Sequence, residues 1–125
     1  MPAKILVVDD EPDTVSLLSI TLGRAGYTVF KASGGKAALE IAAKEKPDLI
    51  ILDIMMPDMT GIDVLRALRV STGAPPPRVI LFTAKSRMED MIEGMEAGAY
   101  KYLVKPTSRE KLLETVKVAL ADAQK

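Results

Sequence analysis

The apolar residues of this chain fall into five short runs, separated by longer segments that have helical periodicity. The runs are Ile5–Val8, Thr28–Phe30, Leu49–Leu52, Val79–Phe82 and Tyr100–Val104. Short runs of this kind are typical of β-strands, whereas the segments between them repeat apolar residues every three or four positions, as helices do. Strands that alternate with helices are joined by right-handed crossovers and run parallel. The pattern therefore predicts a doubly wound α/β domain.

The composition of the runs also predicts the order of the strands. The first, third and fourth runs are uninterruptedly apolar, as strands covered by helices on both faces should be. The second and fifth runs are accompanied by polar residues such as Lys31 and Lys101, which suit the edges of a sheet. Edges at these two positions are what the order 2-1-3-4-5 requires. We expect a five-stranded parallel sheet of this order in one domain spanning residues 1–125.

The helical segments carry start and stop signals. Pro12 suits the first turn of a helix and Gly26 its end; the apolar face between them is made by Val15, Leu18, Leu22 and Ala25. Three hydroxyl residues, Thr60, Ser86 and Thr107, each precede an acidic residue by three positions, and the last two match the capping-box pattern.

The last two helices are also marked by apolar stripes. The stripe of the fourth helix is made by Met88, Met91, Ile92 and Met95, and that of the fifth by Leu112, Leu113, Val116 and Leu120. We interpret the methionine stripe as core filling.

Composition narrows the chemistry that this domain can perform. Lys plus Arg and Asp plus Glu number 17 each, so the chain has no bulk charge to bind nucleic acid or an anionic membrane. It contains no cysteine and no histidine, which excludes thiolate nucleophiles, Ser-His-Asp triads and metals bound by those residues. The first residues lack a signal-peptide core, and no apolar run is long enough to span a membrane. We expect a cytoplasmic protein that does not insert into membranes.

Polar residues gather at the carboxyl ends of the predicted strands. Asp9, Asp10 and Glu11 follow the first strand and Asp53 follows the third, while Thr83 and Lys105 close the fourth and fifth. In an open α/β sheet, ligands bind at this edge, in the crevice where the strand order reverses. For the order 2-1-3-4-5, that crevice lies between the first and third strands, and we expect the functional site there.

At about 4 Å, two carboxylates repel by about 4 kcal/mol at an effective dielectric near 20. A cluster of three would therefore either raise a pKa strongly or recruit a cation. Oxygen ligands without histidine or cysteine select a hard cation, and a half-open site suits Mg²⁺. Such an ion in an α/β crevice normally meets a phosphoryl group, to which Lys105 and Thr83 could also bind. The plausible covalent acceptor is then a carboxylate, and Asp53 is the best placed.

The same residues resemble the receiver domain of two-component response regulators. The motifs that carry the resemblance are Asp9-Asp10, Asp53 with Met56-Pro57 and Gly61, Thr83-Ala84, Gly98-Ala99, and Lys105-Pro106. They occur in the order typical of the family and span nearly the whole chain. The resemblance implies a flavodoxin-like fold with five strands and five helices. It also implies a signalling domain rather than an enzyme, because a receiver catalyses only its own phosphorylation and dephosphorylation.

The resemblance also implies a role for each site residue. Asp53 would accept the phosphoryl group, and Asp10, Asp53 and the backbone carbonyl of Met55 would bind Mg²⁺, with Asp9 acting through water. Lys105 would pair with the phosphoryl group, while Thr83 and Tyr102 would switch conformation. We also expect a cis peptide bond before Pro106, which would turn Lys105 back toward Asp53.

The partners implied are a sensor histidine kinase or a histidine phosphotransfer protein. A downstream protein or a second copy would bind the face made by the fourth helix, fifth strand and fifth helix. A stand-alone receiver and a receiver excised from a longer protein fit the sequence equally.

Three other classes of protein share parts of this pattern. A haloacid-dehalogenase-like phosphatase needs a second aspartate where this chain has Met55, and in a flavodoxin-like electron carrier the acidic residues after the first strand would repel the phosphate. The stronger alternative is a pseudo-receiver, a binding scaffold on the same fold that works without phosphate. The acceptor, metal and lysine positions are all filled, which favours the phosphorylated receiver.

Overall fold

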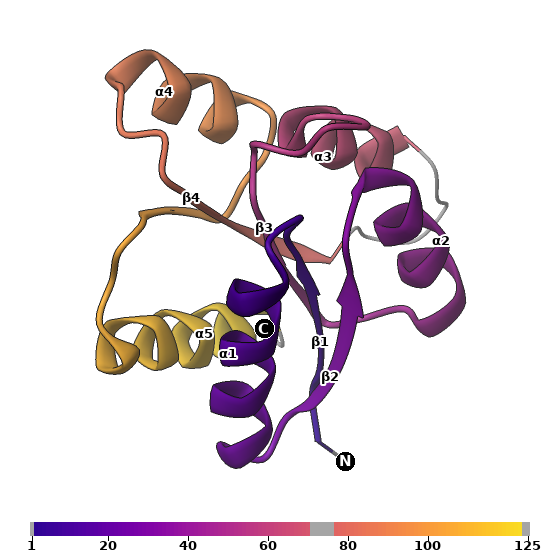
Figure 1. The fold of residues 1–125 in the computed structure, drawn as a ribbon, viewed down its shortest axis with the longest axis vertical. Coiled ribbons are helices and arrows are strands. Elements are labelled where there is room, and N and C mark those ends of the chain that lie inside the picture. The colour runs from indigo at the N-terminus through magenta and orange to yellow at the C-terminus, as the bar shows by residue number, and fades with distance from the viewer. Residues whose placement is uncertain (1, 71–76, 124–125) are drawn as a thin grey trace.

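The computed structural model describes residues 2–70 and 77–123, and within them five strands alternate with five helices. These are β1 (Lys4–Val8), α1 (Pro12–Arg24), β2 (Thr28–Ala32), α2 (Gly35–Glu45), β3 (Leu49–Leu52), α3 (Gly61–Val70), β4 (Arg78–Thr83), α4 (Met88–Glu96), β5 (Lys101–Val104) and α5 (Arg109–Ala123). The strands form one parallel sheet of order β2-β1-β3-β4-β5 (Figure 1). The predicted doubly wound fold and its strand order are both confirmed.

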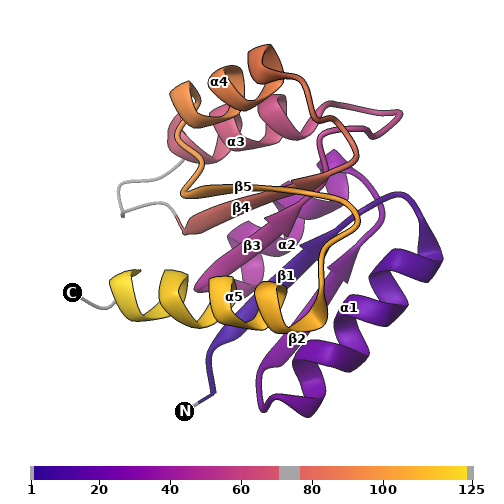
Figure 2. The same cartoon turned by 90° about the vertical axis from the view of Figure 1, so that its left-hand side faces the viewer.

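The sheet is covered on both faces, as the apolar central strands require. Helices α1 and α5 lie on one face, and α2, α3 and α4 lie on the other (Figure 2). Side chains alternate along each strand, so Ile5 and Val7 pack with α1 and α5, whereas Leu6 and Val8 pack beneath the other three helices. The two faces therefore hold separate hydrophobic cores.

The register of the sheet brings the carboxyl ends of the central strands to one level. Val8 pairs with Leu52, and Leu52 pairs with Leu81, so β1, β3 and β4 are aligned at this edge. Thr83 pairs with Val104 at the end of β5. Residues that follow these positions are thereby placed side by side, although they come from four distant parts of the chain.

The end of α1 follows the expected stop signal. Gly26 has a φ of +100°, in the left-handed region that glycine adopts without strain. The backbone N–H of Tyr27 donates to the carbonyl of Leu22 at 3.2 Å, which satisfies one of the last helical carbonyls. Ala25 lies beyond the last helical residue and is exposed, so its assignment to the apolar face of α1 is wrong.

Two of the three helix starts marked by a hydroxyl residue differ from the sequence pattern. At α3, the N–H of Asp63 donates to the Thr60 hydroxyl at 3.1 Å and the N–H of Thr60 donates to the Asp63 carboxylate at 3.3 Å. The expected cap at Ser86 is wrong, because α4 begins one residue later, after Arg87, without a side-chain cap. At α5 the cap is Ser108 rather than Thr107, since the Ser108 hydroxyl accepts the N–H of Lys111 at 3.0 Å.

The interpretation of the methionine stripe as core filling is wrong for three of its four residues, since only Met91 is partly buried. Met88, Ile92 and Met95 are 69%, 50% and 46% exposed. The buried residue of α4 is Gly94, where an added Cβ would lie 2.6 Å from Cδ1 of Leu81. Because α4 approaches the sheet through a glycine, its large apolar side chains are displaced toward solvent.

No helix among the described residues is both long and apolar enough to cross a bilayer.

Candidate functional site

The backbone of two site aspartates is fixed by the sheet itself. Asp9 directly follows β1, and its N–H donates to the carbonyl of Ala32 at 3.2 Å. Asp53 directly follows β3, and its N–H donates to the carbonyl of Val8 at 3.0 Å. Both residues extend the hydrogen-bond ladders by one position, and both are almost completely buried, at 2% and 4% exposed. The sheet thus places two carboxylates side by side in an apolar setting.

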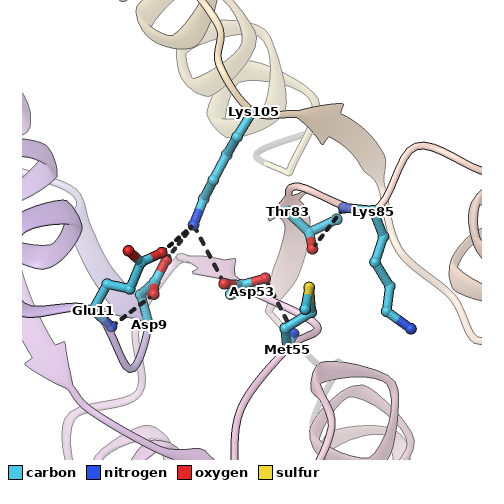
Figure 3. A network of polar contacts seen from close by, with 7 residues as sticks. All are labelled: Asp9, Glu11, Asp53, Met55, Thr83, Lys85 and Lys105. Carbon is cyan, nitrogen blue, oxygen red and sulfur yellow. Dashed lines mark hydrogen bonds and ion pairs between the residues drawn. The ribbon is translucent and has the colours of Figure 1, made fainter.

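Lys105 joins these two carboxylates from the end of β5 (Figure 3). Its ammonium nitrogen lies 2.6 Å from Oδ2 of Asp9 and 3.3 Å from Oδ2 of Asp53, and it reaches Oε1 of Glu11 at 4.0 Å. The lysine side chain is 17% exposed. One partly buried cation therefore bridges two buried anions that follow neighbouring strands.

The environment of Lys105 favours its charged form. Burial by itself would lower the pKa of this ammonium group, but the hydrogen bond to Asp9 and the charge of Asp53 outweigh burial, so the pKa is raised above its ordinary value. The ammonium also lies 5.4 Å from the centre of the Phe82 ring, which attracts a cation. Lys105 thus remains a fixed positive charge at neutral pH.

Each buried aspartate also organises the loop that follows it. Oδ1 of Asp9 accepts the N–H of Glu11 at 3.0 Å, and Oδ1 of Asp53 accepts the N–H of Met55 at 3.1 Å (Figure 3). Bonds from an aspartate to the amide two residues ahead fold the chain into a tight turn. They leave further lone pairs on each carboxylate free to bind a cation or a phosphoryl group.

A third carboxylate completes the cluster. One oxygen each of Asp9, Asp10 and Asp53 lies within 4.8 Å of the others, and Asp10 is exposed while its two companions are buried. The donor set is entirely oxygen and is open to water on the Asp10 side, which fits the coordination that Mg²⁺ prefers. The three acidic residues expected at the crevice are brought together in the structure.

The turn after Asp53 depends on a glycine that was part of the sequence motif. The N–H of Gly61 donates to the carbonyl of Ile54 at 3.0 Å, which closes the β3–α3 loop at its base. A Cβ at Gly61 would lie 2.3 Å from the carbonyl oxygen of Asp53, so no larger residue fits without moving that backbone. Gly61 is therefore needed for the position of Asp53.

Thr83 and Tyr102 lie on the side of the site toward α4. Thr83 is fully buried, and its hydroxyl accepts the N–H of Lys85 at 3.4 Å. The carbonyl of the same Lys85 accepts the Tyr102 hydroxyl at 2.9 Å. Burial, together with the negative charges of Asp90 and Asp53, raises the pKa of Tyr102 to about 12. One short loop thus connects the two residues expected to switch, while Tyr102 itself lies outside the carboxylate cluster.

The turn after β5 agrees with expectation, since the peptide bond between Lys105 and Pro106 is cis.

Two contacts at the site escaped the sequence analysis. The sequence pattern places Phe82, which lies beneath the Lys105 ammonium, in a strand without a further role, and it marks no role for Asp58 in the β3–α3 loop. The Phe82 contact could have been anticipated from register, because β4 and β5 pair next to each other. The Asp58 contact is made to a helix 22 residues away in sequence, and no local pattern marks it.

Fold and site together define an α/β domain with an acidic, lysine-capped crevice at the carboxyl edge of its sheet. The model of the response regulator receiver domain family matches residues 5–117. The chain belongs to this family of two-component signalling domains.

Curated relatives are transcriptional regulators of about twice this length. The chain is 45% identical over 120 residues to the alkaline phosphatase synthesis transcriptional regulatory protein PhoP of Bacillus subtilis. The match covers 96% of this chain and 49% of PhoP. The chain is 40% identical over 119 residues to the probable transcriptional regulatory protein TcrX of Mycobacterium tuberculosis, covering 95% of this chain and 50% of TcrX. The chain spans about half the length of these relatives.

Solved receiver structures superpose along nearly their whole length. The chemotaxis protein CheY4 of Vibrio cholerae is 37% identical with a TM-score of 0.90, and the match covers 95% of this chain and 99% of CheY4. A putative response regulator from Chloroflexus aurantiacus is 33% identical, also with a TM-score of 0.90, and the match covers 97% and 99% of the two chains.

Proposed function

We propose that this receiver domain accepts a phosphoryl group on Asp53 from a histidine kinase or a histidine phosphotransfer protein, in a reaction that depends on Mg²⁺. The observation that carries the proposal is the buried carboxylate of Asp53 facing the ammonium of Lys105 at 3.3 Å, with Asp9 and Asp10 beside it. This arrangement joins a nucleophile, a fixed cation and a set of metal ligands within one crevice.

The transfer needs no general base, because the Asp53 carboxylate acts as an anionic nucleophile. A bond forms between one of its oxygens and phosphorus while the bond from phosphorus to the donor breaks. If the donor is phosphohistidine, the electron pair of the broken P–N bond stays on the imidazole, which is then protonated. Lys105 would balance the charge on the phosphoryl oxygens, as preorganised cations do in phosphoryl transfer.

The metal site proposed here consists of the carboxylates of Asp10 and Asp53 and the backbone carbonyl of Met55, with Asp9 acting through water. Mg²⁺ bound there would neutralise charge on the incoming phosphoryl group and orient it for in-line attack.

Phosphorylation would be read out at the face made by α4, β5 and α5. The new phosphoryl oxygens offer the Thr83 hydroxyl charge-assisted hydrogen bonds, which are stronger than its present bond with the Lys85 amide. Movement of Thr83 would shift the loop that holds the Tyr102 hydroxyl, and with it the setting of α4. The exposed Met88, Ile92 and Met95 could then repack against a downstream protein or a second copy at little cost.

The acceptor is tested by intact mass spectrometry after incubation with acetyl phosphate and Mg²⁺. We expect a single phosphoryl adduct on the wild type, none after Asp53→Asn, and a normal adduct after Asp48→Asn, which changes an exposed aspartate at the opposite edge of the sheet. Full labelling of Asp53→Asn would refute the assignment of the acceptor. A wild type that takes up no phosphate from acetyl phosphate or from phosphohistidine donors would instead identify a pseudo-receiver.

A further inference from the structure

The amino terminus of α2 is capped by a residue from a different part of the chain. Its N-cap residue, Gly34, has no side chain to bond the free amides, and the first turn contains no acidic residue. The carboxylate of Asp58, in the β3–α3 loop, takes this place: its Oδ1 accepts the N–H of Gly35 and its Oδ2 accepts the N–H of Lys36, both at 3.0 Å. These two bonds lower the pKa of Asp58, as expected for a carboxylate at a helix amino terminus.

Two glycines allow this close approach. A Cβ at Gly34 would lie 2.9 Å from Oδ1 and 3.2 Å from Oδ2 of Asp58, and a Cβ at Gly35 would lie 2.2 Å from Cγ of Met59. The φ of Gly34 is −168°, which is extended backbone open to any residue. A larger residue at position 34 would therefore have to displace the Asp58 carboxylate, although its backbone conformation would not be strained.

The loop held in this way is the one that carries Met55. Its base is closed by the bond from Gly61 to Ile54, and its first turn by the bond from the Met55 amide to Asp53. Met55 is 51% exposed, so packing of its side chain contributes little to the orientation of its backbone. The next side chain that fixes the loop by hydrogen bonds is Asp58, three residues after Met55, which accepts the first amides of α2. Helix α2, which Asp58 caps, and helix α3, which follows the loop, lie side by side (Figure 1).

We propose that Asp58 is a positioning residue, which caps α2 from the β3–α3 loop and thereby holds the Met55 carbonyl in the orientation that binds Mg²⁺ beside Asp53. The inference rests on the proposed function, because it concerns the same metal site. Asp58 itself lies outside the carboxylate cluster and would touch neither the ion nor the phosphoryl group.

The first experiment compares Asp58→Ala with Asp48→Ala. Asp48 is a matched control because it is also an exposed aspartate that accepts a backbone amide, that of Lys4 at 2.8 Å, at the opposite edge of the sheet. Mg²⁺ affinity is measured by calorimetry on protein shown to be folded by circular dichroism. Substitution of a residue that orients a metal ligand typically weakens metal binding by about 10–100-fold. We therefore expect Asp58→Ala to bind Mg²⁺ about tenfold more weakly than the wild type. Asp48→Ala should bind as the wild type does.

Two further measurements separate positioning from a general loss of stability. In the absence of Mg²⁺, Asp58→Ala should shift the amide NMR signal of Met55 and speed hydrogen exchange at Gly35 and Lys36. Asp58→Asn retains one oxygen that can accept one of the two amides, so its Mg²⁺ affinity should lie between those of the wild type and Asp58→Ala.

A double-mutant cycle with Gly34→Ala tests the contact from the other side. The added methyl group would displace the Asp58 carboxylate without straining the backbone, so Gly34→Ala should also weaken Mg²⁺ binding. In the Asp58→Ala background the clash is absent, and Gly34→Ala should have no further effect.

The outcomes distinguish this inference from the proposed function. A wild type that binds Mg²⁺ together with an Asp58→Ala variant of equal affinity overturns the inference, and so do fully additive effects of the two substitutions. A wild type that does not bind Mg²⁺ refutes the proposed metal site itself.

Discussion

Replacing Lys105 with methionine keeps much of the length and apolar volume of the side chain but removes the cation that bridges Asp9 and Asp53. At an effective dielectric of 20, charges at the observed 2.6 and 3.3 Å attract by about 6 and about 5 kcal/mol. Most of this attraction is offset by the cost of burying the ammonium group, which the substitution no longer incurs. Removal of one partner of a buried ion pair costs about 3–5 kcal/mol, and we expect the lower limit here because both carboxylates retain backbone donors.

The same substitution should change the response to Mg²⁺. In the proposed metal site, the ammonium of Lys105 and a bound Mg²⁺ would repel each other across the same carboxylates. Without the lysine, Mg²⁺ should bind more tightly and replace the lost positive charge. Ligand at about one hundred times its Kd stabilises a protein by about 2.7 kcal/mol, so Mg²⁺ should restore most of the stability lost by Lys105→Met.

Urea unfolding followed by far-UV circular dichroism, in EDTA and in Mg²⁺ at neutral pH, measures both effects. The control is Lys85→Met, since Lys85 is 41% exposed and its nitrogen lies 3.9 Å from Asp90, a surface pair that contributes about 1 kcal/mol or less. The reasoning is refuted if Lys105→Met in EDTA is as stable as the wild type. It is also refuted if Mg²⁺ stabilises this variant no more than it stabilises the wild type.

Two further substitutions test the surroundings of this cluster. Asp10→Asn should weaken Mg²⁺ binding in calorimetry yet leave the metal-free fold at least as stable, because Asp10 is an exposed carboxylate within 4.8 Å of two others. The control Asp13→Asn, in the first turn of α1, should leave Mg²⁺ binding unchanged. Unfolding of Asp10→Asn would make Asp10 structural. Tyr102 should ionise near pH 12 in an absorbance titration of the folded protein, and this step should disappear in Tyr102→Phe. Since the raised pKa means that the native state favours the neutral phenol, the stability gained from Tyr102 is present below about pH 10 and is lost as the pH rises through about 12. If Tyr102→Phe loses none of the absorbance change near pH 12, this assignment is contradicted.

Patterns along the chain were enough to place the main parts of the site. Apolar runs such as Leu49–Leu52 identify buried strands, since a strand covered on both faces must be apolar at successive positions. Parallel strands bring their carboxyl ends to one edge, so Asp9, Asp53 and Lys105 could be expected to meet before any distance was known. These features depend on period and order, which are properties of the sequence.

Other features depend on how closely one element approaches another, and no local pattern encodes that distance. The stripe of α4 has the period of a buried face, yet Met88 and Met95 are exposed because Gly94 sets the approach of the helix to the sheet. Ser86 stands at a capping position but makes no cap, since α4 begins one residue later than its pattern indicates. Asp58 caps a helix that precedes it by 22 residues, which requires the β3–α3 loop and α2 to pack together first. The periodicity of the sequence thus placed the carboxylates at one edge of the sheet. The packing of helices and loops around that edge decided which polar groups meet, because a hydrogen bond needs contact within about 3 Å.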